Sequence, residues 1–227
     1  MLIPKIVYED SNIIICNKPA GILSQPDRSL SESLLDAVKS YRAARGDRGE
    51  THIINRLDRP VAGLVLFACN AKTAALLSAL SGEHSIEKCY YAVVKGRPDE
   101  KGEFTDFLIK DPKSNTSRVV KDGSGGKKAS LSYKVLGSKD IGGEEYSLVE
   151  IKLRTGRHHQ IRVQFSSRGY ALYGDIKYNP DFAGAKGVSP ALFAYRLAFN
   201  NPYGADRISV NVKPEGRIWE FEYFNSK

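Results

Sequence analysis

The apolar residues of this chain fall mostly into short runs, and this pattern constrains the fold more than any other feature of the sequence. The run at residues 63–68 (GLVLFA) contains no polar position, which is typical of a buried strand. Further strands are predicted at residues 6–8, 13–16, 90–94, 131–136, 146–153, 192–199 and 218–224. Helices are predicted at residues 31–45, capped by Ser31 or Ser33, and at residues 71–80, capped by Asn70. Strands outnumber helices and do not alternate with them regularly, so we expect an α+β fold with a largely antiparallel sheet.

Two polar stretches interrupt these elements. Residues 111–128 (DPKSNTSRVVKDGSGGKK) are predicted to form a mobile surface loop, a type of segment that often carries function and that can close over RNA. Residues 179–190 (NPDFAGAKGVSP) are predicted to be irregular. Neither stretch separates two apolar cores, so the 227 residues are expected to form a single domain, 1–227.

Charge and cysteine content bear on the partners and the compartment. The chain has 34 Lys and Arg against 26 Asp and Glu, and its net charge of +8 fits an anionic partner such as nucleic acid or a membrane surface, although a soluble protein can also simply be basic. Cys16, Cys69 and Cys89 are widely spaced, which predicts buried thiols rather than disulfides or a zinc site. The N-terminus has no signal-peptide pattern and no apolar stretch reaches the roughly 18 residues of a membrane span, so we expect a cytoplasmic protein.

A charged triplet precedes the buried strand. In the segment HIINRLDRPVAGLVLFA (residues 52–68), Asp58 lies between Arg56 and Arg59, and the following Pro and Gly indicate a bent loop that enters the core. Positive charge on both sides holds such a carboxylate in its ionised form. From this segment alone, a solvated turn in which Asp58 only pairs with a neighbouring cation is favoured over a functional site.

A second charged segment, LRTGRHHQIRVQF (residues 153–165), combines polar and apolar side chains. Its basic and amide side chains are Arg154, Arg157, His158, His159, Gln160 and Arg162. Apolar residues are interleaved with them, so part of the segment must be buried, and a buried arginine needs a carboxylate or phosphate partner. The two histidines are adjacent and do not share a face of a helix or strand, which argues against a metal site.

Tyr90 and Tyr91 belong to a third segment, KCYYAVVKG (residues 88–96). On a strand, their side chains point to opposite faces of the sheet. We expect one of them to pack in the core and the other to line a cleft, where its ring would stack on a nucleobase. For either tyrosine taken singly, a core position is favoured over a position in a cleft.

Taken together and in this order, these segments resemble the catalytic core of the RluA/RsuA-type pseudouridine synthases. The resemblance rests on RLD followed by a Gly and an apolar strand, then a KxYxA strand, then TGRxHQIRV. It extends to IVYEDSNIIICNKPAGILSQPD, which is similar to the family's opening hairpin and KPxG turn, and to GKKASLSYKVL, GYALYGDIKY and ALFAYRLAF. The match covers nearly the whole chain.

The resemblance implies a pseudouridine synthase fold: a central, mixed but mainly antiparallel sheet with flanking helices and an RNA-binding cleft. It implies an isomerase that converts specific uridines to pseudouridine in ribosomal or transfer RNA, without a cofactor or a metal. The S4-like RNA-binding domain that precedes the catalytic domain in many members is expected to be absent. We expect a monomer whose partner is RNA and which does not bind a membrane.

The resemblance also implies roles for individual residues. Asp58 occupies the position of the family's invariant catalytic aspartate. Tyr90 occupies the position of the tyrosine that contacts the target base and helps to remove the C5 proton, and Arg162 that of the arginine paired with the aspartate. Arg56 matches an arginine that contacts RNA around the flipped nucleotide. Positions with a structural or RNA-contacting role are matched by Lys18, Arg157, His159 and Gln160.

Three departures from the family pattern bear on RNA specificity rather than on the chemistry. Asn55 stands where many members have His, residues 60–62 (PVA) replace a commoner Thr-Ser pair, and His158 replaces a small hydroxyl residue. Two other functions remain open. The chain could bind RNA without catalysis, or it could hydrolyse a glycosidic bond, but hydrolysis usually needs two carboxylates and no second acidic residue accompanies Asp58 in its motif.

Overall fold

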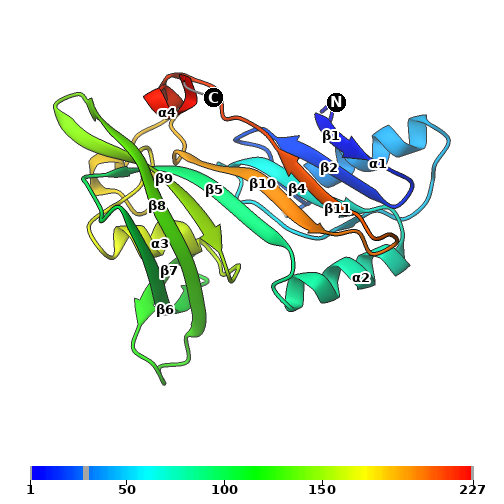
Figure 1. Cartoon of the computed structure of the whole chain (residues 1–227), viewed down its shortest axis with the longest axis horizontal. Coiled ribbons are helices and arrows are strands. Elements are labelled where there is room, and N and C mark those ends of the chain that lie inside the picture. The colour runs from blue at the N-terminus through cyan, green and yellow to red at the C-terminus, as the bar shows by residue number, and fades with distance from the viewer. Residues whose placement is uncertain (1, 28–30, 226–227) are drawn as a thin grey trace. The chain divides into compact units, whose positions relative to one another are not determined.

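The computed structural model describes residues 2–27 and 31–225. The chain divides into two compact units, which are described separately (Figure 1). Unit 1 lies within Met1–Glu87 and Ala194–Lys213, and unit 2 comprises the described part of Lys88–Phe193 and Pro214–Lys227. The expectation of a single domain stays a prediction.

Unit 1 is built on an antiparallel sheet. Its strands are β1 (Ile6–Glu9), β2 (Ile13–Lys18), β3 (His52–Ile53), β4 (Ala62–Ala68), β10 (Leu192–Asn200) and β11 (Arg207–Asn211). They follow the order β1-β2-β4-β10, with β11 beside β10 and β3 beside β4. Strands predicted at residues 6–8, 13–16, 63–68 and 192–199 are therefore confirmed, whereas the short β3 and β11 were not predicted.

The two helices of unit 1 begin at capping side chains. Helix α1 (Leu34–Ala44) starts after Ser33, whose hydroxyl accepts the Asp36 N–H at 3.3 Å while the Asp36 carboxylate accepts the Ser33 N–H at 3.1 Å. This confirms Ser33 of the two candidate caps and moves the helix start from residue 31 to Leu34, because Ser33 itself is extended. Helix α2 (Ala71–Gly82) starts at the predicted cap Asn70, which accepts the Thr73 N–H at 2.8 Å.

The core of unit 1 lies between α2 and the sheet. Its buried members are Ile13, Ile15, Leu64, Leu66, Ala68, Leu77, Ile86, Leu197, Phe199 and Ile208. Gly63 lets β4 approach β10 closely: its φ is +120°, and a Cβ there would lie 2.5 Å from Ala194 N and closer still to Ala194 O. Only glycine fits this backbone conformation and this spacing.

Unit 2 contains a second antiparallel arrangement. Its strands are β5 (Glu87–Lys95), β6 (Lys101–Asp111), β7 (Thr116–Val120), β8 (Lys127–Ile141) and β9 (Glu144–Leu153), in the order β5-β9-β8-β6-β7. Helix α3 (Gln160–Ser166) packs against β6 and β7. The strands predicted at 90–94, 131–136 and 146–153 are confirmed, as is the α+β class with a mainly antiparallel sheet. All three cysteines of the chain are buried, as predicted.

The prediction of a mobile loop over residues 111–128 was wrong. This stretch contains β7, and it also contains the end of β6 and the start of β8. The polar composition concealed a strand with one buried face: Ser117 pairs with Lys110 of β6, and Val119 packs against a cluster of Leu108, Ala129 and Val163. Period-2 burial over only five residues is a weak signal when the exposed face is this polar.

The strand predicted at residues 218–224 was also wrong. A 3₁₀ turn covers Arg217–Trp219 and a short helix α4 covers Glu222–Asn225. Lys139 explains the turn, because its Nζ donates to the carbonyls of Arg217 and Glu220, at 3.3 and 2.9 Å, and lies 4.3 Å from the Phe221 ring centroid. Carbonyls held by one ammonium group do not need a neighbouring strand.

Residues 179–190 are irregular apart from a 3₁₀ turn at Pro180–Phe182, as predicted. Within the described ranges, no helix combines the length and the apolar character that a membrane crossing demands.

Candidate active site

The backbone on both sides of Asp58 is tied to an earlier loop of unit 1. The Ser24 hydroxyl accepts the N–H of Leu57 at 3.1 Å and donates to the carbonyl of Leu57 at 2.8 Å. On the other side, the Gly21 N–H donates to the Arg59 carbonyl at 2.8 Å, and Arg59 Nε donates back to the Gly21 carbonyl at 2.9 Å. Asp58 itself remains partly exposed. The structure thus fixes the main chain on both sides of Asp58 and leaves the residue partly accessible to solvent.

Lys18 also links the loop at residues 19–22 to the backbone beside Asp58. It is 0% exposed, and its Nζ donates to the carbonyls of Pro19, Ile22 and Arg59 at 3.0, 2.7 and 3.2 Å. Burial lowers the pKa of Lys18 to about 7, and the nearby negative charge of Asp58 acts in the opposite direction. Because the hydrogen bonds of Lys18 go to protein carbonyls, a structural role for Lys18 is favoured over RNA contact.

Asn55, one of the departures from the family pattern, anchors the segment that leads to Asp58. Its Oδ1 accepts the N–H of Leu66 at 2.8 Å and its Nδ2 donates to the carbonyl of Leu64 at 3.2 Å. The Asn55 side chain therefore makes the two hydrogen bonds to β4 that a neighbouring strand would otherwise make. Arg56, two residues before Asp58, is exposed, as an RNA contact requires.

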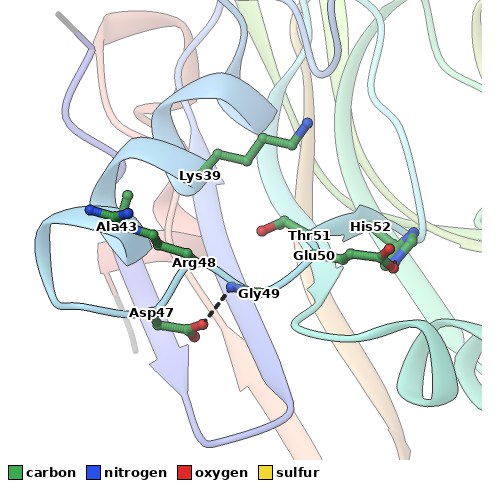
Figure 2. A pocket seen from close by; sticks show the side chains of 8 residues that line it. All are labelled: Lys39, Ala43, Asp47, Arg48, Gly49, Glu50, Thr51 and His52. Carbon is green, nitrogen blue, oxygen red and sulfur yellow. Dashed lines mark hydrogen bonds and ion pairs between the residues drawn. The ribbon is translucent and has the colours of Figure 1, made fainter.

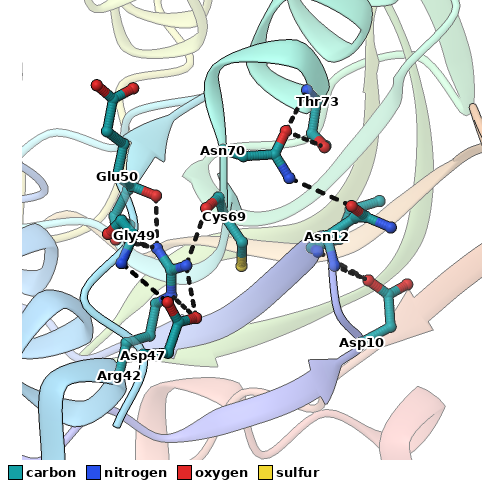
Figure 3. A network of polar contacts seen from close by, with 11 residues as sticks. Asp10, Asn12, Arg42, Asp47, Gly49, Glu50, Cys69, Asn70 and Thr73 are labelled. Atoms are coloured by element: carbon teal, nitrogen blue, oxygen red, sulfur yellow. Dashed lines mark hydrogen bonds and ion pairs between the residues drawn. The ribbon is translucent and has the colours of Figure 1, made fainter.

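A buried arginine that the sequence did not reveal holds the preceding segment in place (Figure 3). Arg42 of α1 is 5% exposed and pairs with Asp47 at 2.6 Å. The same guanidinium donates to the Thr51 hydroxyl at 2.6 Å and to the Cys69 carbonyl at 2.8 Å, as well as to the carbonyls of Gly49 and Glu50. Residues 47–51 are thereby attached to α1 and to the end of β4.

An open pocket of about 490 Å³ lies over this segment (Figure 2). Its lining residues are Lys39, Ala43, Asp47, Arg48, Gly49, Glu50, Thr51 and His52. Basic and acidic side chains alternate around it, and the His52 ring pairs with Glu50 at 2.9 Å. The mixed charge gives no preference for an anion, and none of the residues singled out by the family resemblance lines the pocket.

In unit 2, the two tyrosines of β5 are each 7% exposed. Tyr91 packs edge-on against Phe224 and Tyr223, with ring centroids 5.1 and 6.2 Å apart. This confirms that one of the two tyrosines packs in the core. Tyr90 points to the opposite face of the strand and lies opposite Ile151 of β9.

Arg162 of α3 is buried and is held by a carboxylate that the sequence analysis did not assign, Asp175. Arg162 Nε donates to Oδ2 and Nη2 donates to Oδ1 of Asp175, both at 2.7 Å. The expectation that a buried arginine in this segment needs an acidic partner is confirmed. In the sequence, Asp175 is visible only as part of GDIKY at residues 174–178, and nothing in that segment indicates that Asp175 pairs with Arg162.

Gln160 and Arg157 fasten the loop before α3. Gln160 Oε1 accepts from the Thr155 hydroxyl at 2.7 Å and from the Arg157 N–H at 3.0 Å, while its Nε2 donates to the Ser130 carbonyl at 3.1 Å. Gln160 is 3% exposed, so its structural role is favoured over RNA contact. Arg157 is exposed, and its Nε donates to the Lys128 carbonyl at 2.9 Å.

His159 occupies a left-handed backbone position, with φ at +54°, where the loop turns into α3. Its Nδ1 is 2.7 Å from the Tyr178 hydroxyl, and its ring stacks on His158 with centroids 3.7 Å apart. His158 in turn contacts the Ser117 hydroxyl through Nδ1 at 2.9 Å.

The predicted site residues are thus distributed over both units. Lys18, Arg56 and Asp58 belong to unit 1, and Tyr90, Arg157, His159, Gln160 and Arg162 belong to unit 2. Within unit 1, Lys18 lies close enough to Asp58 for their charges to interact. The pairing of Asp58 with Arg162 stays a prediction.

A family model described as RNA pseudouridylate synthase matches residues 12–167, a range that contains Asp58, Tyr90 and Arg162. The chain belongs to this family. It is similar to "Ribosomal large subunit pseudouridine synthase D" of Borreliella burgdorferi, at 33% identity over 85% of this chain, and spans 60% of that relative's length. It is also similar to "tRNA pseudouridine synthase C" of Haemophilus ducreyi, at 32% identity over 91% of this chain and 89% of the relative.

Solved structures agree with the fold. "Human RNA Pseudouridylate Synthase Domain Containing 1" superposes with a TM-score of 0.76 at 22% identity, covering 93% of this chain and 83% of the other. "Human RNA Pseudouridylate Synthase Domain Containing 4" superposes with a TM-score of 0.75 at 20% identity, covering 92% of this chain and 87% of the other. The expected pseudouridine synthase fold is therefore confirmed.

Proposed function

We propose that this chain isomerises specific uridines to pseudouridine in RNA and that Asp58 is the catalytic carboxylate. The observation that carries the proposal is the anchored loop. Ser24 and Gly21 tie the main chain on either side of Asp58, Lys18 binds the carbonyl of the next residue, and Asp58 is partly exposed. An acid on a fixed backbone that solvent can reach is what a reaction on a large substrate requires.

One carboxylate is enough for this reaction. Formation of pseudouridine breaks the bond between N1 and C1′, rotates the uracil and rejoins it through C5. No atoms are gained or lost, so no cofactor has to supply electrons or groups. Asp58 starts the reaction either as a nucleophile or as an acid–base group.

Residues of unit 2 complete the proposed mechanism. Arg162 would orient Asp58, and Tyr90 would form one wall around the detached uracil and help to remove the proton from C5. The proposal requires these side chains to act on the same uridine as Asp58. Arg56 and Arg157 would contact the RNA, whereas Lys18, Gln160 and the buried His159 would hold the loops that carry the site.

Ribosomal or transfer RNA is the proposed substrate, in line with the names of the relatives in both classes. The target base must leave its stack, which costs a few kcal/mol. Phosphate contacts from a protein of net charge +8 offset that cost. We expect a monomer that works in the cytoplasm, where these RNAs are made and used.

The test uses total RNA labelled with tritium at uridine C5, prepared from cells that lack this gene. An isomerase releases tritium to water, and we expect Asp58→Asn to abolish the release while RNA affinity stays within about tenfold, because no phosphate contact is removed. An RNA-binding protein without catalysis would release nothing in either form. A glycosidic hydrolase would yield free uracil instead.

A further inference from the structure

Asp175 is held in place by its own turn, independently of Arg162. Its Oδ1 accepts the backbone N–H groups of Lys177 and Tyr178 at 3.0 and 3.3 Å. The residue before it, Gly174, has a φ of +72°, and any side chain there would collide with the carbonyl of Ser189. The carboxylate is 0% exposed, so it cannot turn towards water. The structure therefore provides a fixed anion for Arg162 to bind.

The same guanidinium lies over the ring of Tyr178. Arg162 Cζ lies 5.1 Å from the centroid of the Tyr178 ring, a distance at which a cation is attracted to an aromatic face. The Tyr178 hydroxyl is itself fixed, because it accepts the Ser117 N–H at 2.7 Å and lies 2.7 Å from His159 Nδ1. Two side chains, Asp175 and Tyr178, thus contact the Arg162 guanidinium.

We propose that Asp175 is a positioning residue for Arg162. Because Asp175 engages Nε and Nη2, it fixes the plane of the guanidinium and the directions in which the other N–H groups of Arg162 point. This inference rests on the proposed isomerase function. Arg162 alone has several rotatable bonds, and a fork with a fixed carboxylate selects one orientation of its planar group.

A second aspartate–arginine pair in unit 2 provides a matched control. Arg168 donates to both carboxylate oxygens of Asp106 at 3.0 Å, and its Cζ lies 4.0 Å from the Phe104 ring centroid. This pair reproduces the fork and the aromatic face, but it is more exposed, at 30% and 12% for the two side chains. It has no proposed part in the reaction.

The experiment compares the full-length wild-type protein with Asp175→Asn, Asp175→Glu and Asp106→Asn. Tritium release from the labelled total RNA gives kcat and an apparent KM, and thermal unfolding shows that each variant is folded at the assay temperature. Asp175→Glu keeps the charge and displaces the guanidinium by about one methylene. We expect kcat to fall about 100-fold in Asp175→Asn and at least about tenfold in Asp175→Glu, with KM within about threefold, because misplacement by 1 Å is enough for such losses.

Asp106→Asn should keep the wild-type kcat even where it loses as much thermal stability as Asp175→Asn. Wild-type kcat in a folded Asp175→Glu or Asp175→Asn would overturn the positioning role and leave the isomerase function standing. An equal loss of kcat in Asp106→Asn would also overturn the positioning role, because the loss would then not be specific to the pair of Asp175 and Arg162. If Asp175→Asn does not fold, the charge-conserving Asp175→Glu decides. Absence of release by the wild-type protein would instead refute the proposed function.

Discussion

Ser24 offers the sharpest test of how the Asp58 loop is built, because one hydroxyl serves both polar groups of the Leu57 backbone. Ser24 is 5% exposed and Leu57 is 7% exposed, so water has little access to the groups that Ser24→Ala would leave without a partner. Each such buried group costs about 1–3 kcal/mol. We expect the lower half of the combined range, about 3 kcal/mol, because a small shift of the loop lets some water in.

For a chain of this size, a loss of about 3 kcal/mol lowers Tm by about 6–12 °C. The same loosening moves Asp58, so kcat for tritium release should fall about tenfold at a temperature where the variant is folded. Ser11→Ala is the control, because the exposed Ser11 hydroxyl accepts a hydrogen bond from the neighbouring Asn12 side chain and takes no part in the hydrogen bonds between Ser24 and Leu57. An unchanged Tm and an unchanged kcat in Ser24→Ala would show that the hydroxyl does not anchor the loop.

Three further predictions follow from the same geometry. Gly63→Ala should be severely destabilising, with little folded protein recovered, because its Cβ would overlap the Ala194 backbone. Gly46 also has a positive φ, +83°, but lies in open space, so Gly46→Ala should cost only about 1 kcal/mol in urea unfolding. Burial lowers the pKa of Lys18 to about 7 in the folded protein, against an ordinary value of 10.5. Between these pH values the unfolded chain binds the proton more tightly than the folded protein does. The contribution of Lys18 to the free energy of unfolding therefore rises with pH. Lys18→Met should flatten that rise in urea titrations from pH 7 to 10, and parallel curves would contradict the assignment. Arg157→Ala should weaken RNA binding and reduce the slope of log affinity against log salt by about 1 in filter binding; an unchanged slope would remove Arg157 from the phosphate contacts.

The parts of the fold that the sequence predicted are those set by neighbouring residues. Ser33 and Asn70 cap helices because a hydroxyl or amide three residues away reaches the first N–H groups. The strand at residues 63–68 was predicted because it is apolar throughout. The loop that carries Asp58 was predicted from its Pro and Gly.

The parts that the sequence did not predict depend on contacts between distant residues. Ser24 and Leu57 are separated by 33 positions, and Arg162 and Asp175 by 13. No local sequence pattern identifies either pair. Any serine can bind a backbone group, and several acidic residues of the chain could pair with a buried arginine. The region after residue 216 was mispredicted for the same reason: Lys139, far away in the chain, binds its carbonyls and selects a turn over a strand.

The central claim is that the carboxylate of Asp58 makes pseudouridine in cellular RNA. The most direct measurement is a pseudouridine map of ribosomal and transfer RNA from cells that lack this gene, complemented with either the wild-type gene or Asp58→Asn. We predict that specific sites disappear in the deletion, return with the wild-type gene and stay absent with Asp58→Asn expressed at an equal level. Restoration of those sites by Asp58→Asn would contradict the claim.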